Sequence, residues 1–538
     1  MKYKERPELK IWCKSNAHSV YRHTCMEEND SASLVLHTGR NMTAVAQIFL
    51  WHSWIDFDIN GWETSDLPSG VSVTGWFQGY HTFNDGVPYP DRMTSEKNVT
   101  VKANTAQGIV LRFQTAPDAE TGIIHIRVTV KTHNFKNGDL PMTADIFLHV
   151  HSTVLPEPKD CSVGHEYHIE PFVIFKPEFK SPFEPFYPYA EQSDGWWELV
   201  AAIARETKTL RINTLYINPI PLLSRGAGTR KTGENTWHLD YSFLDRYVRC
   251  FLDNGSFKTI ALAGLVQWVT GETIDSFDEE GKVTKIPLKG DRAAEAAAWQ
   301  EAYFTDIIRH FKEKGWADRM VFHLQDEPHA AESWLWARAI CRKVDPNAVC
   351  MEPIDTYGMA RSLGDNCDIP VPRLEIYQHD MEYFDEYREK GNKVWCYSCC
   401  APNEPGWLNK FIDLPSRYSR MLSWACFTQE LSGFLHWGFC HWDVGSDPGN
   451  RFKGDGFIVY PDVPNNGVLP SNRGLATTEG MEEWELLTQL KKYAPDTAEA
   501  LARKIAKSFD NFNPDPKALD AARAELLTML DAYTKEEA

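Results

Sequence analysis

The sequence predicts a multidomain α/β protein with an N-terminal β-sandwich, a (β/α)8 barrel of the TIM type and C-terminal helices. Three observations lead to this fold. Residues 1–155 contain short β-rich runs between turn residues, residues 165–475 alternate strand and helix patterns, and residues 476–538 repeat apolar residues at helical spacing. A chain of 538 residues is long enough for two or three domains, each with its own core.

The N-terminal region contains a series of candidate strands. These are β-rich runs at 33–37, 44–51, 71–74, 98–102, 108–113, 122–130 and 144–150. Turns are predicted at Asn60-Gly61, Asn84-Asp85-Gly86 and Asn137-Gly138, because these residue types accept the left-handed backbone of tight turns. Strands at this spacing are typical of a β-sandwich, and we expect it to support the next domain rather than to bind a ligand directly.

Strand and helix patterns alternate after a proline-containing linker at 155–160. Strands are predicted at 171–175, 212–218, 259–264, 320–324, 348–352, 369–377, 394–398 and 433–437. Helices are predicted at 191–208, 242–253, 293–314, 330–343, 380–389 and 415–429. About eight such units predict a (β/α)8 barrel. A doubly wound open sheet is the alternative, but no phosphate-binding glycine fingerprint follows any of the strands.

The last part of the chain is predicted to be a loop followed by helices. A stretch rich in Asp, Gly, Pro and Asn runs from Trp442 to about residue 474, with a possible hairpin strand at 454–461. Four apolar residues then recur at helical spacing, namely Met481, Trp484, Leu487 and Leu490. We expect these helices to pack on the barrel or on the sandwich.

Composition and charge narrow the possible partners. The chain is 43% apolar and 24% charged, as is usual for a globular protein. Its net charge is −19 without any basic block, which makes nucleic acid an improbable partner. The first ten residues have no apolar core of a signal peptide and no run reaches transmembrane length, so no membrane partner and a cytoplasmic location are expected.

The cysteine pattern argues against a zinc site of the usual kind. Twelve cysteines are scattered along the chain without a CxxC spacing. Free, mostly buried thiols in a reducing compartment explain them most simply. The sequence therefore predicts no metal and no cofactor.

The strongest local signal is the acidic pair Asp326-Glu327. It ends the apolar run at 320–324, the fourth predicted strand, and active sites of (β/α)8 barrels lie at the carboxyl ends of the strands. Burying two carboxylates there is costly unless they have a use. Pro328 is expected to keep Glu327 extended, because its ring disfavours the helical region for the preceding residue. The competing interpretation is a capping role at the start of the helix that follows.

Two carboxylates at such a place suggest the cleavage of a glycosidic bond, which needs a proton donor and a second group. The seventh strand, where many retaining barrels carry a nucleophile, has no carboxylate before Glu404. Glu375, on the predicted sixth strand, is an alternative, whereas Glu430 precedes its strand and is expected at the opposite end. A substrate with a 2-acetamido group can supply the nucleophile itself, with Asp326 polarising the acetamide N–H and Glu327 protonating the leaving oxygen.

Several motifs in this order resemble glycoside hydrolase family 123. They are the QDEP sequence at 325–328, WCY at 395–397, GFLHW at 433–437, GDGFIVYP at 454–461 and GMEEWELL at 480–487. The family comprises retaining β-N-acetylgalactosaminidases that act by substrate assistance. The resemblance implies that Glu327 is the acid/base and that Asp326 stabilises an oxazolinium-like intermediate. The expected partner is then a glycan or glycolipid carrying terminal β-linked N-acetylgalactosamine.

Further residues are expected to line a sugar site because they end strands or flank the acidic pair. Trp437 is expected to stack on a sugar face and Tyr397 to reach the acetamide carbonyl. The other candidates are Tyr216, Asn218, His323, Gln325 and Glu375, with Tyr377, Trp268 and Trp442 ranked below them.

Two other hypotheses for the function remain open. One is a glycosidase for another sugar, in which Glu375 or Glu404 acts directly as nucleophile or base. The other is a non-catalytic carbohydrate-binding protein, since a barrel scaffold does not by itself imply catalysis.

Overall fold

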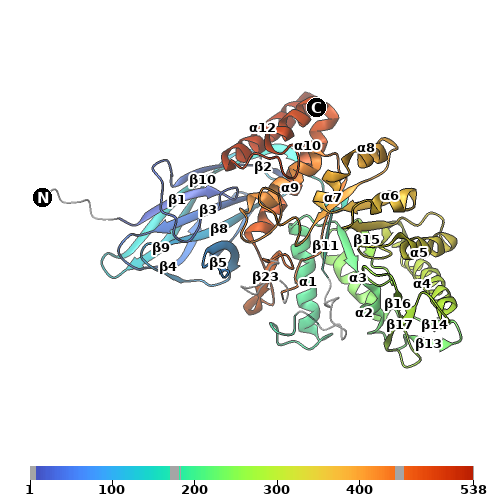
Figure 1. Ribbon diagram of the computed structural model, residues 1–538. Helices are drawn as coiled ribbons and strands as arrows, with labels where there is room; N and C mark the ends of the chain where they lie inside the picture. Colours follow the sequence, from blue (N-terminus) through green and yellow to red (C-terminus); the bar gives the residue numbers. More distant parts are fainter. Residues whose placement is uncertain (1–7, 170–180, 182, 443–452, 537–538) are drawn as a thin grey trace. The chain divides into compact units, whose positions relative to one another are not determined.

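The computed structural model describes residues 8–169, 181, 183–442 and 453–536. Its contacts divide the chain into two units. The first unit contains residues 1–157, 405–429 and 442–538, and the second contains residues 158–404 and 430–441. The first boundary falls within the predicted linker. The mixed α/β class, the β-rich N-terminal region and the C-terminal helices are confirmed (Figure 1).

Two five-stranded sheets form the β-rich part of the first unit. Their orders are β1-β3-β8-β5-β6 and β2-β10-β9-β4-β7. The strands are β1 (Lys10–Ser15), β2 (Ser33–Arg40), β3 (Thr43–Trp51), β4 (Phe57–Thr64), β5 (Val71–Thr82), β6 (Pro88–Thr94), β7 (Val99–Val101), β8 (Ala106–Thr115), β9 (Gly122–Asn134) and β10 (Gly138–Val154). Alternate side chains from both sheets, such as Ile48 and Leu111 from one and Ile126 and Leu148 from the other, share one apolar core.

One of the three predicted turns is wrong. Asn60-Gly61 lies inside β4, where the pairing with β9 shifts register between Ile59 and Trp62. Gly61 has a φ of 97°, so the glycine serves a β-bulge and not a chain reversal. The predicted turns at 84–86 and 137–138 do connect β5 to β6 and β9 to β10.

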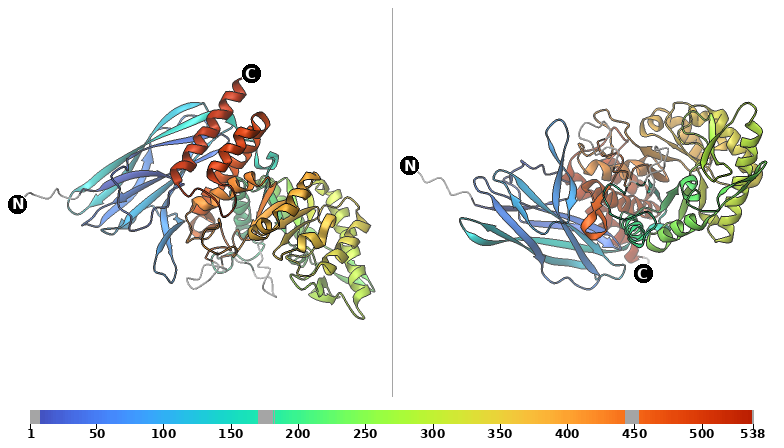
Figure 2. Two further views of the ribbon diagram at one scale, coloured as in Figure 1. Left: turned by 45° about the horizontal axis from the view of Figure 1, so that its top comes forward. Right: turned by 90° about the horizontal axis from the view of Figure 1, so that it is seen from below.

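The first unit also contains a short hairpin and four helices. The hairpin pairs β23 (Val459–Asp462) with β24 (Gly467–Pro470), and the helices are α9 (Arg417–Thr428), α10 (Asn472–Tyr493), α11 (Pro495–Ile505) and α12 (Pro516–Glu536). The predicted apolar spacing is confirmed, because Met481, Trp484, Leu487 and Leu490 are all buried in α10. Helix α12 packs along β2 and β10 (Figure 2).

Buried charges join these helices to one another. Arg420 of α9 donates to Glu483 and to Glu479 of α10, and its Nη1 lies 3.3 Å from Oε2 of Glu479. Arg523 of α12 donates to Glu483 at 3.1 Å and to Glu482 at 2.9 Å. Such a network is stable only while each charge keeps its partners, so we expect it to define how the helices pack.

Parallel strands dominate the second unit. Six of them form one sheet in the order β18-β15-β12-β11-β22-β21, and two more, β19 and β20, pair with each other. Single parallel bridges also join Phe322 to Cys350 and Arg373 to Tyr397. The strands are β11 (Gly164–His168), β12 (Thr214–Ile217), β15 (Thr259–Leu262), β18 (Met320–Phe322), β19 (Met351–Ile354), β20 (Ile369–Pro372), β21 (Trp395–Ser398) and β22 (Gly433–His436).

Helices and two small hairpins connect these strands. The helices are α1 (Asp194–Thr209), α2 (Pro219–Leu223), α3 (Ser242–Asn254), α4 (Ala293–Glu313), α5 (Ala331–Val344), α6 (Met359–Leu363), α7 (Leu374–His379) and α8 (Met381–Glu389). The hairpins pair β13 (Arg230–Gly233) with β14 (Thr236–His238) and β16 (Thr273–Phe277) with β17 (Val283–Pro287). No described helix is long and apolar enough to cross a membrane.

Two predicted strands of this unit do not correspond over their full length to strands that the structure describes. The strand predicted at 171–175 lies outside the described residues, and the first parallel strand that the structure describes is β11. The strand predicted at 369–377 is wrong in its second half, because β20 ends at Pro372 and helix α7 follows. The two prolines of β20 lack the N–H that a longer ladder needs, and Leu374, Ile376 and Tyr377 bury one face of α7.

Candidate active site

The acidic pair lies in the loop that follows β18. Asp326 and Glu327 are both partly buried, and α5 begins only at Ala331 with Ala330 as its N-cap residue. The backbone N–H of Val269 donates to the carbonyl oxygen of Asp326 at 3.2 Å, which ties this loop to the one that follows β15. The pair therefore does not cap α5, and its carboxylates remain available for chemistry.

The backbone of Glu327 differs from the prediction. Its φ is 46°, in the left-handed region, whereas the sequence suggested an extended residue before Pro328. Proline disfavours the right-handed helical region for the residue before it, but that constraint leaves more than one alternative. A non-glycine residue held at positive φ costs about 1–3 kcal/mol and is maintained by its surroundings, as is frequent at functional sites.

Two aromatic side chains donate hydrogen bonds to the carboxylate of Glu327. The hydroxyl of Tyr397, on β21, donates to Oε1, and the indole N–H of Trp268 donates to Oε2 at 3.2 Å. Tyr397 is 3% exposed, whereas Trp268 is 49% exposed and presents a large apolar surface beside the carboxylate. Trp268 therefore matters more to this site than its rank in the sequence analysis suggested.

Burial and negative charge both keep protons on the acidic pair. Burial raises the pKa of Asp326 well above its usual value, and the charges of Glu327, Asp355 and Glu166 add to the effect. Burial also raises the pKa of Glu327, against the hydrogen bonds from Tyr397 and Trp268, which favour its ionised form. The two groups titrate as a pair that holds a proton to higher pH than an isolated carboxylic acid would.

Two charged residues that the sequence analysis did not select also face the pair. Asp355 directly follows β19, and its charge raises the pKa of both Asp326 and Glu327. Its carboxylate accepts a hydrogen bond from Thr356 at 2.9 Å. Arg373 directly follows β20, forms the bridge to Tyr397 and lowers the pKa of Glu327 through its charge. Asp355 is the first polar residue after the predicted strand 348–352, so a rule based on strand ends would have found it. Arg373 lies inside the predicted strand 369–377, and its position at a strand end becomes visible only because β20 ends at Pro372.

A buried glutamate, Glu352, binds the backbone that follows β18. Oε2 of Glu352, on β19, accepts hydrogen bonds from the backbone N–H of Leu324 at 2.7 Å and of Gln325 at 3.3 Å, and from the indole of Trp334 at 2.7 Å. Burial raises the pKa of Glu352 well above its usual value. These contacts fix the two residues that immediately precede Asp326.

A second buried polar group lies around Glu166 of β11. Nε2 of His168 and Nε2 of His323 lie 3.4 Å and 3.7 Å from Oε1 of Glu166. Burial favours the neutral acid, but the two histidines hold the pKa of Glu166 below its usual value. The ring of Tyr216 stacks on the ring of His168, with their centroids 3.6 Å apart, and makes an edge contact with the ring of His323. The predicted residues Tyr216 and His323 therefore belong to one group close to the acidic pair.

Other predicted site residues have structural partners. The side chain of Gln325 donates to the carbonyl oxygen of Val269 at 3.2 Å and accepts from Ser333 at 2.6 Å. The side chain of Asn218 accepts from the N–H of Ile220 at 3.2 Å, at the start of α2. Gln325 thus holds two loops together, while Asn218 caps a helix at the end of β12.

The predicted residues on α7 are oriented by arginines. Glu375 accepts a hydrogen bond from Arg373, whose charge faces the acidic pair. Glu375 itself is not a member of that pair. The fully buried Tyr377 accepts from Arg388 at 2.8 Å. Both residues stand on a helix and not on the sixth strand.

The aromatic residues after β22 differ in exposure. Trp437 directly follows the strand, is partly buried and stacks on His441 at 5.5 Å. Trp442 is 3% exposed and donates to the carbonyl oxygen of Val459 at 2.8 Å, within the first unit. Glu404 and Glu430 are both exposed. Of these residues, Trp437 is the one whose position at a strand end suits a sugar face.

Cavity volume does not locate this site. A cavity of about 590 Å³ lies in the first unit, beside the bulge of β4, and includes Trp62 and Trp76 in its lining. A smaller cavity of about 200 Å³ in the second unit is lined by the first residues of several parallel strands, among them Gly164, Thr259 and Trp395. Asp326 and Glu327 line neither of them, so the site is located by its chemistry.

Comparison with known families gives one match. Residues 224–490 match the model described as "Glycoside hydrolase 123, catalytic domain". This range contains the acidic pair and its contacts from Trp268, Asp355, Arg373 and Tyr397. No curated protein matches the sequence.

Among solved structures, the chain is similar to a family 123 glycoside hydrolase from Clostridium perfringens that was analysed for glycolipid glycan hydrolysis. The TM-score is 0.77 at 16% sequence identity, over 98% of this chain and 99% of that chain. Weaker similarities reach a β-glucuronidase from Bacteroides uniformis, with a TM-score of 0.33 at 10% identity over 86% of this chain and 48% of that chain. The similarity to an endoglucanase from Clostridium acetobutylicum has a TM-score of 0.37 at 11% identity, over 61% of this chain and 99% of that chain.

Proposed function

Since the chain carries a family 123 catalytic domain and is a glycosidase, we propose that it removes terminal β-linked N-acetylgalactosamine by a retaining, substrate-assisted mechanism. The observation that carries the proposal is the adjacent pair Asp326 and Glu327 at a strand end. Both have raised pKa values through burial, and Glu327 accepts bonds from two aromatic donors. A glycolipid glycan is the proposed substrate class, by analogy with the Clostridium perfringens enzyme.

We also propose that the eight parallel strands of the second unit close into a (β/α)8 barrel. Support comes from the bridges Phe322–Cys350 and Arg373–Tyr397, which connect the β19–β20 pair to β18 on one side and to β21 on the other. One apolar cluster contains side chains from six of these strands, among them Tyr216, Met351 and Leu435. In a barrel, the loops that hold Asp326 and Asp355 would meet at the carboxyl ends of the strands, where such enzymes place their active sites.

Glu327 serves as the general acid and then as the general base. In the first step the acetamide carbonyl oxygen attacks the anomeric carbon while Glu327 gives its proton to the leaving oxygen, which departs with the aglycone. In the second step the Glu327 carboxylate takes a proton from water, and that water opens the oxazolinium ring at the anomeric carbon. Two displacements at one carbon give retention.

Asp326 stabilises the positive charge that forms on the acetamide nitrogen. Its carboxylate accepts a hydrogen bond from the acetamide N–H, and this bond orients the acetamide carbonyl oxygen toward the anomeric carbon. An N–H donor at Asp326 also favours its ionised form. Substrate binding therefore directs the shared proton of the pair to Glu327, next to the oxygen that must receive it.

Aromatic side chains supply the sugar contacts in this proposal. Trp268 offers an exposed face next to Glu327, and Trp437 follows β22, the neighbour of the strand β21 that carries Tyr397. Stacking of apolar C–H faces on such rings buries surface without requiring ring substituents of one orientation. Tyr397, held against Glu327, is placed to reach the acetamide carbonyl when the sugar is bound.

Asp355 favours one alternative mechanism. It is a third carboxylate whose charge acts on both members of the pair, and it follows the fifth parallel strand. In a glycosidase of another specificity it would act as a direct nucleophile and carry a covalent sugar. That mechanism does not require a 2-acetamido group on the substrate.

Aryl glycosides test the proposed function. The 4-nitrophenyl β-glycosides of N-acetylgalactosamine, N-acetylglucosamine and galactose should show turnover only with a 2-acetamido sugar, and fastest with the first. NMR of the fresh product should show the β-anomer. Comparable turnover of the galactoside, or an α-anomer as first product, would contradict the mechanism. Binding of all three sugars without turnover by the intact protein would overturn the catalytic assignment.

A further inference from the structure

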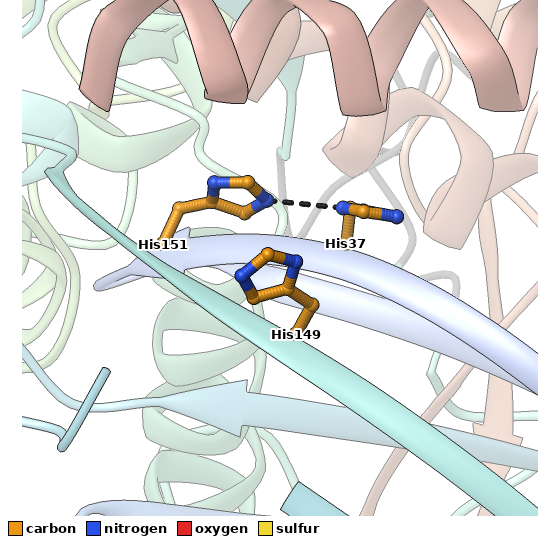
Figure 3. A group of neighbouring side chains, drawn as sticks. All are labelled: His37, His149 and His151. Atoms are coloured by element: carbon orange, nitrogen blue, oxygen red, sulfur yellow. Dashed lines mark hydrogen bonds between the residues drawn. The ribbon is translucent and has the colours of Figure 1, made fainter. Parts of the chain in front are cut away.

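Three histidines gather on the outer face of a sheet in the first unit. His37 on β2 lies opposite His149 on β10 in the parallel pairing, and His151 is two residues further along β10. Side chains at every second position of a strand share a face, so all three point the same way. Leu148 and Val150, the residues on either side of His149, point into the apolar core. Figure 3 shows the three rings turned toward one another on that face.

The ring nitrogens are close enough to share one ion. One nitrogen from each of His37, His149 and His151 lies within 4.8 Å of the others, and Nδ1 of His37 lies 3.0 Å from Nε2 of His151. In a tetrahedral zinc site with Zn–N bonds of about 2.0–2.1 Å, ligand nitrogens are about 3.3 Å apart. The 3.0 Å separation is close to that value and the other separations do not exceed 4.8 Å, so small side-chain movements suffice.

An aspartate of α12 sets the tautomer of one ligand. Nδ1 of His151 lies 2.9 Å from Oδ2 of Asp531. Because a carboxylate can only accept, Nδ1 carries the proton, and the lone pair of Nε2 points toward His37, from whose Nδ1 it accepts a hydrogen bond that a bound ion would replace. A carboxylate on the outer nitrogen of a ligating histidine is the usual arrangement around protein zinc. Ser152 holds Asp531 in turn, through its N–H at 2.8 Å and its hydroxyl at 2.7 Å.

The positive charge beside the cluster is offset by acidic partners. Arg523 donates to the carbonyl oxygen of His37 at 2.9 Å, and its guanidinium is paired with Glu482 and Glu483. Bringing three rings together without a shared ion offers little hydrogen bonding, since the described contacts include one bond among them.

We propose that His37, His149 and His151 bind one divalent transition-metal ion, Zn²⁺ by preference, with Asp531 as the partner that orients His151. Three neutral imidazoles suit zinc and its neighbours in the first transition row rather than magnesium or calcium. The ion joins strands that are 112 residues apart in sequence, His37 and His149, and secures α12 against them through Asp531. Closing so long a loop favours a structural role. The cysteine spacing considered in the sequence could not reveal such a site.

Metal titration of the full chain tests this site. After dialysis against a chelator, zinc sulfate should bind with one equivalent per chain and raise the melting temperature as its concentration increases. Cobalt sulfate should give the intense visible absorption of a tetrahedral site. His149→Gln should abolish both effects. Asp531→Asn should weaken zinc binding by about 10–100-fold while the site still fills at higher metal concentration.

The matched control is His133→Gln. His133 is a partly exposed histidine on β9 of the same sheet, with its own aspartate partner at 2.9 Å, but it lies outside the cluster. It should leave stoichiometry, absorption and melting shift unchanged. Circular dichroism of each metal-free variant establishes that it is folded before titration. A wild-type chain without stoichiometric binding, or a His149→Gln chain that binds as tightly as wild type, would overturn the proposal.

Discussion

Replacing Tyr397 by phenylalanine should shift the pH dependence of the enzyme in a defined direction. The Tyr397 hydroxyl donates to Oε1 of Glu327, and this bond lowers the pKa of the carboxyl by stabilising its ionised form. The substitution removes the donor and keeps the ring. The pKa of Glu327 must therefore rise. Because the first step needs protonated Glu327, activity should persist to higher pH.

The size of the shift follows from the hydrogen bonds that remain. A hydrogen bond to a charged group contributes about 1.5–3 kcal/mol, and about 1.4 kcal/mol corresponds to one pH unit. Trp268 still donates to Oε2 at 3.2 Å, and the carboxylate is only partly buried, so the lower end applies. The basic limb of kcat/KM should move up by about one pH unit. If Tyr397 also binds the acetamide carbonyl, the plateau should fall as well.

The assay is kcat/KM against pH for an N-acetylgalactosaminide with a poor leaving group, where protonation limits the rate. Tyr377→Phe is the matched control, since Tyr377 is equally buried in the same unit but bonds to Arg388. Its profile should follow wild type. A basic limb that stays in place or moves down in Tyr397→Phe would refute the assignment of Glu327 as the acid that Tyr397 tunes.

Five other substitutions, at four residues, distinguish residues that take part in the chemistry from residues that support the structure. Glu327→Gln should lower turnover by about two to four orders of magnitude on poor leaving groups and much less on good phenolates; equal losses on both would count against an acid. Asp326→Asn should reduce kcat strongly with little change in the Kd of a substrate analogue, measured by calorimetry; near-normal kcat would remove its charge-stabilising role. Glu352→Gln should retain kcat within a few-fold, because burial raises the pKa of Glu352 and so favours its neutral form, and an amide oxygen still accepts, whereas Glu352→Leu leaves three N–H donors without their acceptor and should cost about tenfold or more; equal effects would exclude the positioning role. Arg420→Met should destabilise the fold by about 3 kcal/mol in denaturant titrations, because Glu483 loses a buried partner, with normal kcat per folded molecule; an unchanged midpoint would show that the network contributes little.

Local pattern was sufficient where a residue's role depends on its place along a strand. Asp326, Glu327 and Tyr397 were found because each ends or follows an apolar run, and the structure brings Tyr397 and Glu327 into contact. Asp355 follows a predicted strand in the same way, although it belongs to no familiar motif. Arg373 directly follows β20, but the predicted strand continues past it to residue 377, so the sequence pattern does not mark it.

Sequence patterns do not predict contacts and backbone conformations that depend on the path of a loop. Nothing in the periodicity around Trp268 shows that its indole reaches Glu327, because that contact depends on the conformation of the loop after β15. The left-handed backbone of Glu327 is likewise imposed by its surroundings, since Pro328 excludes one region without choosing another. The prolines of β20 indicate an irregular strand, but the sequence pattern predicts a strand where helix α7 follows and carries Glu375 and Tyr377.

Some motif residues serve packing and not chemistry. A Cβ atom on Gly433 would lie 1.9 Å from the ring of Trp395, so the glycine of the GFLHW motif makes room for a tryptophan on the neighbouring strand. A Cβ on Gly480 would lie 2.5 Å from the carbonyl oxygen of Arg420, where α9 and α10 approach closely. Such positions identify a fold more securely than they identify a substrate.

Stepwise fluorination of the substrate's acetamide is the most direct test of substrate assistance. If the acetamide carbonyl oxygen is the nucleophile, each fluorine withdraws electrons from it and changes its shape little. Rates on aryl 2-acetamido, monofluoro-, difluoro- and trifluoroacetamido galactosides should fall steeply along the series, and a thiazoline analogue of the cyclic intermediate should bind more tightly than substrate. A flat series, together with a covalent sugar trapped on Asp355, Glu375 or Glu404, would contradict the mechanism even if Asp326 and Glu327 were both essential.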